Sequence, residues 1–291
     1  MARPGRSLIR VPVVRHRTGE AGERERDAVT VEEPLEIRIA LPTPEGWVSR
    51  SVAVTMRTPG RDFELAAGFV LTEAVVRDRD DIRELTYCRS GRDDQEYNIV
   101  EVRLRSADGV DLDRLTRNVY TTSSCGVCGK ASLEAVELQG CEPIPLEGTL
   151  RLDADTIADL PDRLRSAQSD FGRTGGIHAA GLVDEEGRIT RSHEDIGRHN
   201  AVDKVLGEAF LASETPLHGR ALVVSGRASF EILQKALAGG VPMVVAVGAP
   251  SSLAVELAQT FGVTLAGFAR GGRFNLYAGE ERVVFVGGDP T

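Results

Sequence analysis

The pattern of apolar and polar positions divides the chain into two halves of different kind. In the first half, apolar and polar residues alternate over residues 31–55, which is typical of strands with one buried face, and residues 42–46 supply a turn. A helix is predicted to begin with Asp62 as its N-cap, and further strand-like runs cover residues 84–88 and 97–104. The first half is therefore predicted to be a small α+β domain built on an antiparallel sheet.

In the second half, short apolar runs alternate with segments of helical periodicity. The apolar runs predict buried strands at residues 177–183, 221–224, 241–247 and 264–269. The periodic segments predict helices at residues 155–169, 200–212, 229–238 and 253–261. Strands that alternate with helices in this way indicate an α/β layered domain.

The boundaries between these parts follow from local composition. Residues 1–30 are rich in Arg, Glu and Gly, and we expect a flexible N-terminal extension with an early strand at residues 7–14. The α+β domain is assigned to residues 31–118 and the α/β domain to residues 151–287. Between them, residues 119–150 hold a C-x-x-C loop, a helix and a proline-containing linker.

Composition and charge exclude several classes of protein. The chain has 291 residues, of which 41% are hydrophobic and 27% are charged, as in ordinary soluble proteins. Its net charge of -9 argues against nucleic-acid binding through a general basic surface, although a local basic pocket is still possible. No apolar run approaches the roughly 20 residues that span a bilayer, and the first 17 residues lack the apolar core of a secretory signal. We therefore expect a cytoplasmic protein with no membrane or nucleic-acid partner.

The segment TTSSCGVCGK at residues 121–130 holds two of the four cysteines, Cys125 and Cys128. Such a pair could be half of a structural zinc site, but Cys88 and Cys141 stand alone, so the second half is missing and no zinc is expected. A thiol oxidoreductase would need the pair at the start of a helix that follows a strand. A sulfur carrier needs an accessible thiol on a segment that reaches two partners, whereas two ordinary buried thiols would need an apolar pocket. The spacing alone leaves these alternatives open.

Other candidate residues lie where predicted strands meet predicted helices. Ser225 and Arg227 follow a buried strand and precede a helix, which is where α/β sheets place their ligands. The run at residues 194–204 is rich in donors and acceptors, among them Asp195 and His199. These groups suit a polar ligand with purine and phosphate groups, and the alternative is a capped helix with solvated charges. The pattern of a P-loop is absent from the sequence.

Several longer motifs accompany the thiol pair. The most distinctive is TTSSCGVCG at residues 121–129. The others are RTPG at 57–60, ELA at 64–66, TGGIHAA at 174–180, EDIGRHNAVDK at 194–204, SGRASFE at 225–231, APSSLA at 249–254 and GFAR at 267–270. By these motifs the chain resembles, over most of its length, the sulfurtransferase family that activates formate dehydrogenases, the FdhD family.

The resemblance implies a function for the thiol pair. A cysteine desulfurase would load sulfur onto Cys125 as a persulfide, and the protein would pass it to the molybdenum cofactor, bis-molybdopterin guanine dinucleotide, before insertion into formate dehydrogenase. Cys128 would assist or resolve the persulfide. The resemblance also implies a homodimer. If it fails, the alternatives are a non-catalytic chaperone that binds the cofactor for formate dehydrogenase, and a C-x-x-C thiol oxidoreductase.

The resemblance further implies a cofactor site and a fold. The guanine dinucleotide site falls on Phe268, Ala269, Arg270, Gly271, Gly272 and Arg273. An aromatic ring there can stack on a base, the glycines allow close approach of the backbone, and the arginines can fork onto phosphate.

The C-terminal domain of the family is similar to the cytidine-deaminase fold. The deaminase motifs H-x-E and P-C-x-x-C are replaced here by HAA at residues 178–180 and PSSL at residues 250–253, so the zinc ligands and the glutamate are missing.

Overall fold

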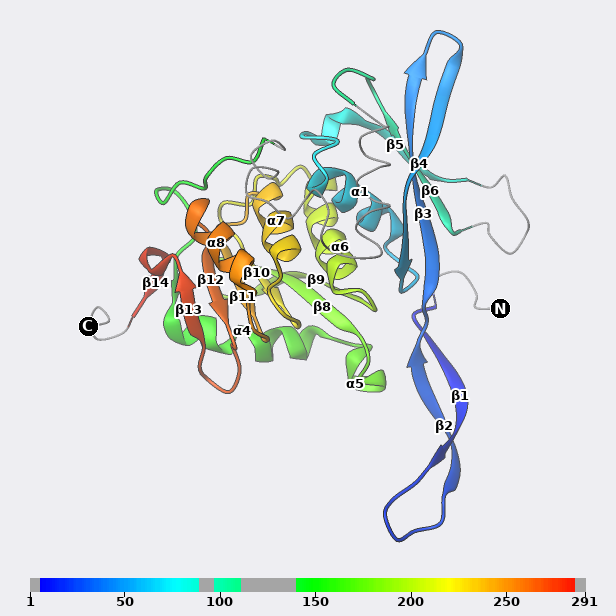
Figure 1. Ribbon diagram of the computed structural model, residues 1–291, viewed down its shortest axis with the longest axis vertical. Coiled ribbons are helices and arrows are strands. Elements are labelled where there is room, and N and C mark those ends of the chain that lie inside the picture. The colour runs from blue at the N-terminus through cyan, green and yellow to red at the C-terminus, as the bar shows by residue number, and fades with distance from the viewer. Residues whose placement is uncertain (1–5, 89–96, 111–139, 286–291) are drawn as a thin grey trace.

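The computed structural model describes residues 6–88, 97–110 and 140–285, and within them the chain forms two packed halves and a projecting hairpin (Figure 1). The strands of the N-terminal half are β3 (Glu33–Thr43), β4 (Gly46–Arg57), β5 (Ile82–Tyr87) and β6 (Ile99–Leu104), in the sheet order β4-β3-β6-β5. Helix α1 (Asp62–Thr72) packs on this sheet, and the short helix η1 (Arg79–Asp81) precedes β5. The α+β assignment and the β3–β4 hairpin are confirmed.

Two details of this half differ from the sequence predictions. The sheet is mixed, not antiparallel, because β6 returns to the edge of β3 in the same direction and pairs with it in parallel. Asp62 is not the N-cap of α1: that position is held by Arg61, in a left-handed conformation with φ of 59°. Asp62 is the first helical residue, and its carboxylate forms an ion pair with Arg57 instead of capping the helix.

The C-terminal half is a six-stranded sheet covered by helices on both faces. Its strands are β8 (His178–Val183), β9 (Ile189–Asp195), β10 (Ala221–Val224), β11 (Met243–Ala246), β12 (Thr264–Gly267) and β13 (Asn275–Ala278), in the order β13-β12-β11-β10-β8-β9. The central strands β10, β11 and β12 run parallel, and β8 and β13 join them antiparallel. The predicted layered α/β arrangement is present.

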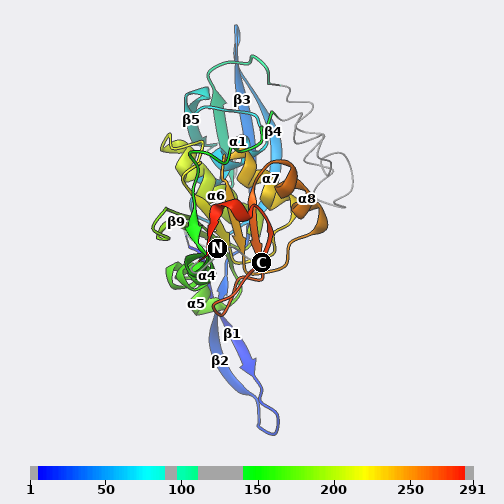
Figure 2. The same cartoon turned by 90° about the vertical axis from the view of Figure 1, so that its left-hand side faces the viewer.

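Alternate residues of the buried strands face two separate apolar cores. Leu222 and Val224 pack with helices α6 (Arg198–Leu211), α7 (Phe230–Ala238) and α8 (Ser252–Thr260). Ala221 and Val223 pack with α4 (Ala154–Ala167) on the other face. Figure 2 shows α4 and α8 on opposite sides of the sheet. Because successive residues of a strand point to opposite faces of the sheet, helices pack on both faces. The C-terminal half therefore has three layers, with the sheet between two layers of helices.

The remaining elements complete the second half. They are the short helix α5 (Phe171–Thr174), the parallel pair β7 (Leu152–Asp153) and β14 (Val283–Val284), and the short helix η2 (Glu280–Arg282). None of the helices in the described parts of the chain is long and apolar enough to cross a membrane.

The N-terminal segment is a hairpin of β1 (Leu8–Arg15) and β2 (Glu23–Thr30), where the sequence predicted one strand. Both views show it extending away from the body. It is tied at its base, where the Thr30 hydroxyl donates to the Gly176 carbonyl near α5. The sequence did not predict the second strand, because β2 is highly charged and largely exposed and so lacks a clear apolar pattern.

The two halves are joined by close packing of α1 against α6. A methyl group added at Gly68 would overlap the backbone carbonyl of Asp203, and one added at Gly207 would overlap the backbone of Glu64. Phe210 of α6 lies in the apolar core of the N-terminal sheet. The two helices therefore approach to backbone contact, which only glycine permits at these positions.

Candidate functional site

The candidate ligand-binding residues gather at one edge of the six-stranded sheet. The parallel strands β10, β11 and β12 end there, and the antiparallel strands β8 and β13 begin there. Ser225 and Arg227 follow β10, residues 268–273 follow β12, and His199 lies in the first turn of α6. The β12–β13 loop protrudes at the lower edge of the sheet in Figure 1. The carboxyl ends of strands are where α/β sheets bind ligands, and we call this region the strand-end edge.

The loop after β12 presents a ring and two guanidinium groups outward. The Phe268 amide donates to the Gly248 carbonyl at 3.0 Å, while its side chain is 40% exposed. Phe268 has a φ of 53°, which is uncommon for a bulky residue and is a form of backbone strain found at functional sites. Ala269 is fully buried and anchors the loop through its amide to the Ala246 carbonyl at 3.1 Å. Its predicted role therefore reduces to holding Phe268 and Arg270 in place.

The turn that follows is built on two glycines. The Arg270 amide donates to the Arg273 carbonyl at 2.9 Å, and Gly271 and Gly272 have φ of 60° and 71°. A methyl group added at either glycine would contact nothing. The backbone is therefore open to solvent there, as close approach of a ligand requires, and the positive φ values explain why glycine is present.

Ser225 has a structural use in addition to its place at the edge. Its amide donates to the Ala179 carbonyl, and its hydroxyl accepts from the Ala179 amide, both at 2.9 Å. These two bonds hold the start of β8 against the end of β10. Ser225 therefore fixes the two strands relative to each other at the strand-end edge. Its hydroxyl already accepts a hydrogen bond from the Ala179 amide.

Four arginines at this edge form no ion pair within the described parts of the chain. Arg198, Arg227, Arg270 and Arg273 form no ion pair or side-chain hydrogen bond with the described residues. The carboxylate of Glu231 faces His199, whose Nε2 lies 2.8 Å from Oε2. That contact is the main reason why the pKa of Glu231 is lowered, so the carboxylate stays ionised. A basic surface thus exists locally on an acidic chain.

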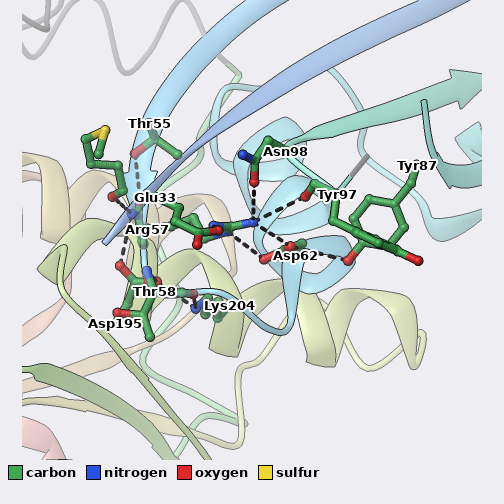
Figure 3. Close-up of polar contacts among 12 residues, drawn as sticks. Glu33, Thr55, Arg57, Thr58, Asp62, Tyr87, Tyr97, Asn98, Asp195 and Lys204 are labelled. Atoms are coloured by element: carbon green, nitrogen blue, oxygen red, sulfur yellow. Dashed lines mark hydrogen bonds and ion pairs between the residues drawn. The ribbon is translucent and has the colours of Figure 1, made fainter. Parts of the chain in front are cut away.

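Asp195, which the sequence predicts to bind cofactor, lies in the joint between the halves instead (Figure 3). It is fully buried, and its Oδ2 pairs with the Lys204 ammonium at 2.6 Å and accepts from the Thr58 amide at 3.1 Å. Its Oδ1 accepts from the Gly197 amide at 2.8 Å and from Asn200 at 3.1 Å. These partners come from both halves, so Asp195 holds the start of α6 against the β4–α1 turn. Its side chain offers no surface to a ligand.

A second buried charge, Arg57, was not predicted to have a role. Its guanidinium is 1% exposed and forks onto Asp62 at 3.0 and 3.1 Å (Figure 3). It also donates to the Tyr97 carbonyl at 3.2 Å and to Asn98 at 3.3 Å. The Tyr87 hydroxyl donates to Asp62 at 3.3 Å, and burial together with this carboxylate raises the tyrosine pKa. The RTPG motif at residues 57–60 marks this cluster in the sequence.

Cys125 and Cys128 lie outside the described residues. The two described cysteines, Cys88 and Cys141, are free, and burial is the main cause that raises the pKa of each thiol. A raised pKa keeps a thiol protonated and weakly nucleophilic. Among the described residues, no group of three or more His, Cys, Asp or Glu side chains could hold a metal ion. Neither described thiol is therefore suited to nucleophilic chemistry.

The ends of the described chain on either side of the thiol pair lie near each other. Val110 and Arg77 line the same hollow, together with Ser213 just beyond the end of α6. A methyl group added at Gly140 would lie 2.7 Å from the Arg77 guanidinium. Both anchors of the thiol segment are therefore at the C-terminal end of α6, whereas the strand-end edge lies at its N-terminal end.

Comparisons with known proteins identify the family of this chain. The profile of the FdhD/NarQ family matches residues 30–284. The sulfur carrier protein FdhD of Streptomyces avermitilis is 50% identical over 283 residues, which cover 96% of each chain. The protein of the same name from Mycobacterium tuberculosis is 49% identical over 278 residues, covering 93% of this chain and 96% of the relative.

The fold is also found among solved structures. A crystal structure described as a formate dehydrogenase accessory protein from Desulfotalea psychrophila superimposes with a TM-score of 0.72 and 24% identity. The match covers 96% of this chain and all of that one. On the family profile and the close relatives, the chain belongs to the FdhD/NarQ family.

Proposed function

We propose that this protein is a sulfur carrier that takes sulfur from a cysteine desulfurase as a Cys125 persulfide and passes it to bis-molybdopterin guanine dinucleotide before that cofactor enters formate dehydrogenase. Relatives with about 50% sequence identity to this chain are named sulfur carrier proteins. The observation that carries the cofactor part of the proposal is the group of unpartnered arginines beside an exposed phenylalanine at the strand-end edge.

In this proposal, the strand-end edge binds the guanine end of the molybdenum cofactor, which is the substrate. Phe268 offers a ring for stacking on the base, a contact worth about 1–3 kcal/mol in other proteins. Arg270 and Arg273 lie on a turn whose glycines leave its backbone open, so their guanidinium groups can reach phosphate. His199 and Arg227 flank this surface from α6 and from the loop after β10.

The proposed transfer balances if the two cysteines act in turn. The Cys125 thiolate attacks the terminal sulfur of the desulfurase persulfide, a new S–S bond forms, and the desulfurase thiolate leaves with the electron pair of the broken bond. The Cys128 thiolate then attacks the Cys125 sulfur, which forms a Cys125–Cys128 disulfide and releases the terminal sulfur as hydrosulfide to the molybdenum centre. The two cysteines supply the two electrons, and a thiol reductant restores them.

The length of the thiol segment is sufficient for this route. Helix α6 has 14 residues, so its two ends are about 21 Å apart. Cys125 is fifteen residues from Val110 and fifteen from Gly140. An extended chain of that length reaches about 50 Å, so either anchor allows Cys125 to reach the strand-end edge.

The resemblance also leads us to propose a cytoplasmic homodimer whose C-terminal half has a cytidine-deaminase-like fold without zinc. Sedimentation equilibrium at micromolar concentration tests the dimer, and a single species of monomer mass contradicts it. Metal analysis of the purified protein tests the zinc statement, and one bound zinc per chain contradicts it.

The function is tested by complementation of a strain that lacks this gene. Cys125→Ala is expected to abolish formate dehydrogenase activity, because the sulfur acceptor is gone, while Cys141→Ala leaves it intact. Full activity of Cys125→Ala together with Cys128→Ala would favour the cofactor-binding chaperone instead. An active Cys125–Cys128 disulfide couple in an insulin-reduction assay would favour a thiol oxidoreductase.

A further inference from the structure

The turn between β3 and β4 carries an exposed tryptophan that the proposed sulfur transfer does not use. Trp47 is the single tryptophan of the chain, and it is 39% exposed at the start of β4. The next residue, Val48, is 44% exposed. Figure 1 shows the β3–β4 hairpin reaching beyond the other strands of its sheet, at the opposite end of the molecule from the β1–β2 hairpin. A large apolar side chain on such a projecting turn is accessible to another protein.

Two arginines hold the indole ring of Trp47. The guanidinium carbon of Arg83 lies 5.4 Å from the ring centroid, and that of Arg103 lies 5.7 Å from it. Both distances are within the roughly 6 Å over which a cation is attracted to an aromatic ring. Arg103 is itself fixed by ion pairs with Glu84 and Glu101, each at 2.9 Å. The ring is therefore restrained before a partner binds, which reduces the entropy that binding would cost.

The side of the ring that Arg83 covers also carries an available positive charge. Arg83 is exposed and forms no ion pair with the described residues, whereas the carboxylates beside Arg103 are already paired with that arginine. Trp and Arg are two of the residue types that contribute most to protein–protein binding, where they fill desolvated pockets. Trp47, Val48 and Arg83, which we call the Trp47 tip, therefore fit a protein surface with an apolar pocket bordered by carboxylates.

The Trp47 tip lies at the end of the N-terminal sheet where the chain enters the thiol segment. Strand β6 runs parallel to β3, so it leaves the sheet at the same end as the β3–β4 turn. Shortly after β6, Arg105 and Val110 line the hollow at the upstream anchor of the thiol segment. Arg77 lines the same hollow and is the neighbour of Gly140, the downstream anchor. The strand-end edge, by contrast, lies at the far end of α6.

We propose that the Trp47 tip is the docking surface for the protein that donates sulfur to Cys125, which the proposed function identifies as a cysteine desulfurase. This inference rests on the proposed function, because it supposes that a donor protein delivers sulfur to the thiol segment. A donor on the tip sits beside both anchors of that segment, and Cys125 is fifteen residues from each. The acceptor enzyme would instead approach the strand-end edge, where the cofactor binds in the proposed function. The tip contributes binding and no chemical step.

The single tryptophan permits a direct test by ¹⁹F NMR. The full chain is produced with 5-fluorotryptophan, so its spectrum contains one resonance, that of Trp47. Unlabelled cysteine desulfurase, at a concentration that loads sulfur onto the chain, is expected to shift this resonance, because the ring enters a new environment. Formate dehydrogenase at the same concentration should not shift it. A resonance that keeps its position with the desulfurase, or that shifts with the dehydrogenase alone, would overturn the proposal.

The second measurement is the rate of sulfur loading as a function of desulfurase concentration, followed by intact mass. Trp47→Ala is expected to raise the half-saturating concentration about thirtyfold, as loss of a central interface residue does. Its rate at saturation should match the wild type, because Cys125 is untouched. Arg83→Gln should raise the half-saturating concentration by a smaller factor. A purely structural role of Trp47 would not separate these two kinetic quantities.

The matched control is Val54→Ala, an exposed apolar residue of the same strand that lies seven positions along β4, about 20 Å from Trp47. It should load sulfur like the wild type, and thermal melts should show that all variants are folded. Equal half-saturating concentrations for Trp47→Ala and the wild type would refute the docking surface and leave the carrier function in place. A wild-type chain that gains no sulfur at any desulfurase concentration would refute the proposed function itself.

Discussion

At the scale of single residues, the N-terminal half and its joint with the C-terminal half both depend on charges that water does not reach. Arg57 pairs with Asp62, and Lys204 pairs with Asp195, with all four side chains almost fully buried. A buried charge is tolerated only when its partner and its hydrogen bonds are all present. Both clusters meet this condition, and Lys204 also donates to the Thr58 carbonyl at 2.9 Å.

Removal of one partner should therefore cost much more here than on the surface. Arg57→Met leaves the Asp62 carboxylate buried without its cation, and we expect a loss of about 3–5 kcal/mol in the free energy of unfolding. The control is Arg15→Met, which breaks the exposed pair of Arg15 with Glu25 in the hairpin and should cost less than about 1 kcal/mol. Urea unfolding followed by circular dichroism measures both. Equal losses would show that the Arg57 cluster does not stabilise the fold.

Stability should also depend on pH through His193. Burial is the main cause that lowers its pKa, and it outweighs the opposing effect of Glu208, whose carboxylate lies 2.8 Å from Nε2. The unfolded chain then takes up a proton near the ordinary value of 6.5, whereas the folded protein does so only at lower pH. The unfolded state binds more protons in this range, so stability falls as the pH drops below 6.5.

Urea unfolding of the wild type and of His193→Gln at pH 7.5 and 5.5 tests this dependence. The substitution keeps a hydrogen-bond donor toward Glu208 but removes the titration. We expect the variant to lose less stability between the two pH values than the wild type does. The same loss in both proteins would show that His193 does not contribute.

At the scale of elements, periodicity predicted most of the fold. The buried strands β10, β11 and β12 were found because they are continuous apolar runs, and α6, α7 and α8 because their apolar residues recur at helical spacing. Of the strands that were missed, β2, β9 and β13 lie in the hairpin or at the edges of the large sheet and mix polar with apolar residues. The other two, β7 and β14, are only two residues long. Their pairing depends on neighbours that are distant in sequence, which local patterns do not reveal.

The crossing of α1 and α6 is the element-scale feature most sensitive to mutation. Gly68→Ala places a methyl group against the Asp203 backbone, which cannot move without separating the helices. We expect a loss of about 3 kcal/mol or more in the free energy of unfolding. Gly172→Ala is the matched control, because a methyl group there contacts nothing and the residue also lies in a helix. Differential scanning calorimetry compares the two, and a Gly68→Ala melting temperature equal to that of the control would contradict the account.

At the scale of the whole molecule, the candidate site could be predicted only in part. Phe268, Arg270 and Arg273 were assigned through the family resemblance, and Arg227 was assigned from its place after a buried strand. The exposure of these side chains agrees with a binding role. Asp195 was assigned to the same site, but its neighbours in space, Thr58 and Lys204, make it a structural residue. Charged residues in a motif look alike in sequence whether they contact ligand or protein. Only the fold shows that Arg57 holds elements of the N-terminal half together and that Asp195 serves the joint.

In the proposed function, the whole-molecule arrangement also separates two tasks. The anchors of the thiol segment lie at one end of α6, and the strand-end edge lies at the other. We infer that sulfur travels along the length of this helix on Cys125 while the cofactor stays bound at the edge. Loss of the edge arginines should therefore impair delivery to the cofactor without preventing the loading of sulfur.

The central claim, that Cys125 carries the sulfur, is tested most directly by intact-mass spectrometry. The full chain is incubated with a cysteine desulfurase and cysteine, freed of small thiols and weighed without reduction. We predict a gain of one sulfur atom on the wild type and on Arg198→Gln, and no gain on Cys125→Ala. A wild-type mass that does not change, or a Cys125→Ala variant that gains sulfur as fully as the wild type, would contradict the account.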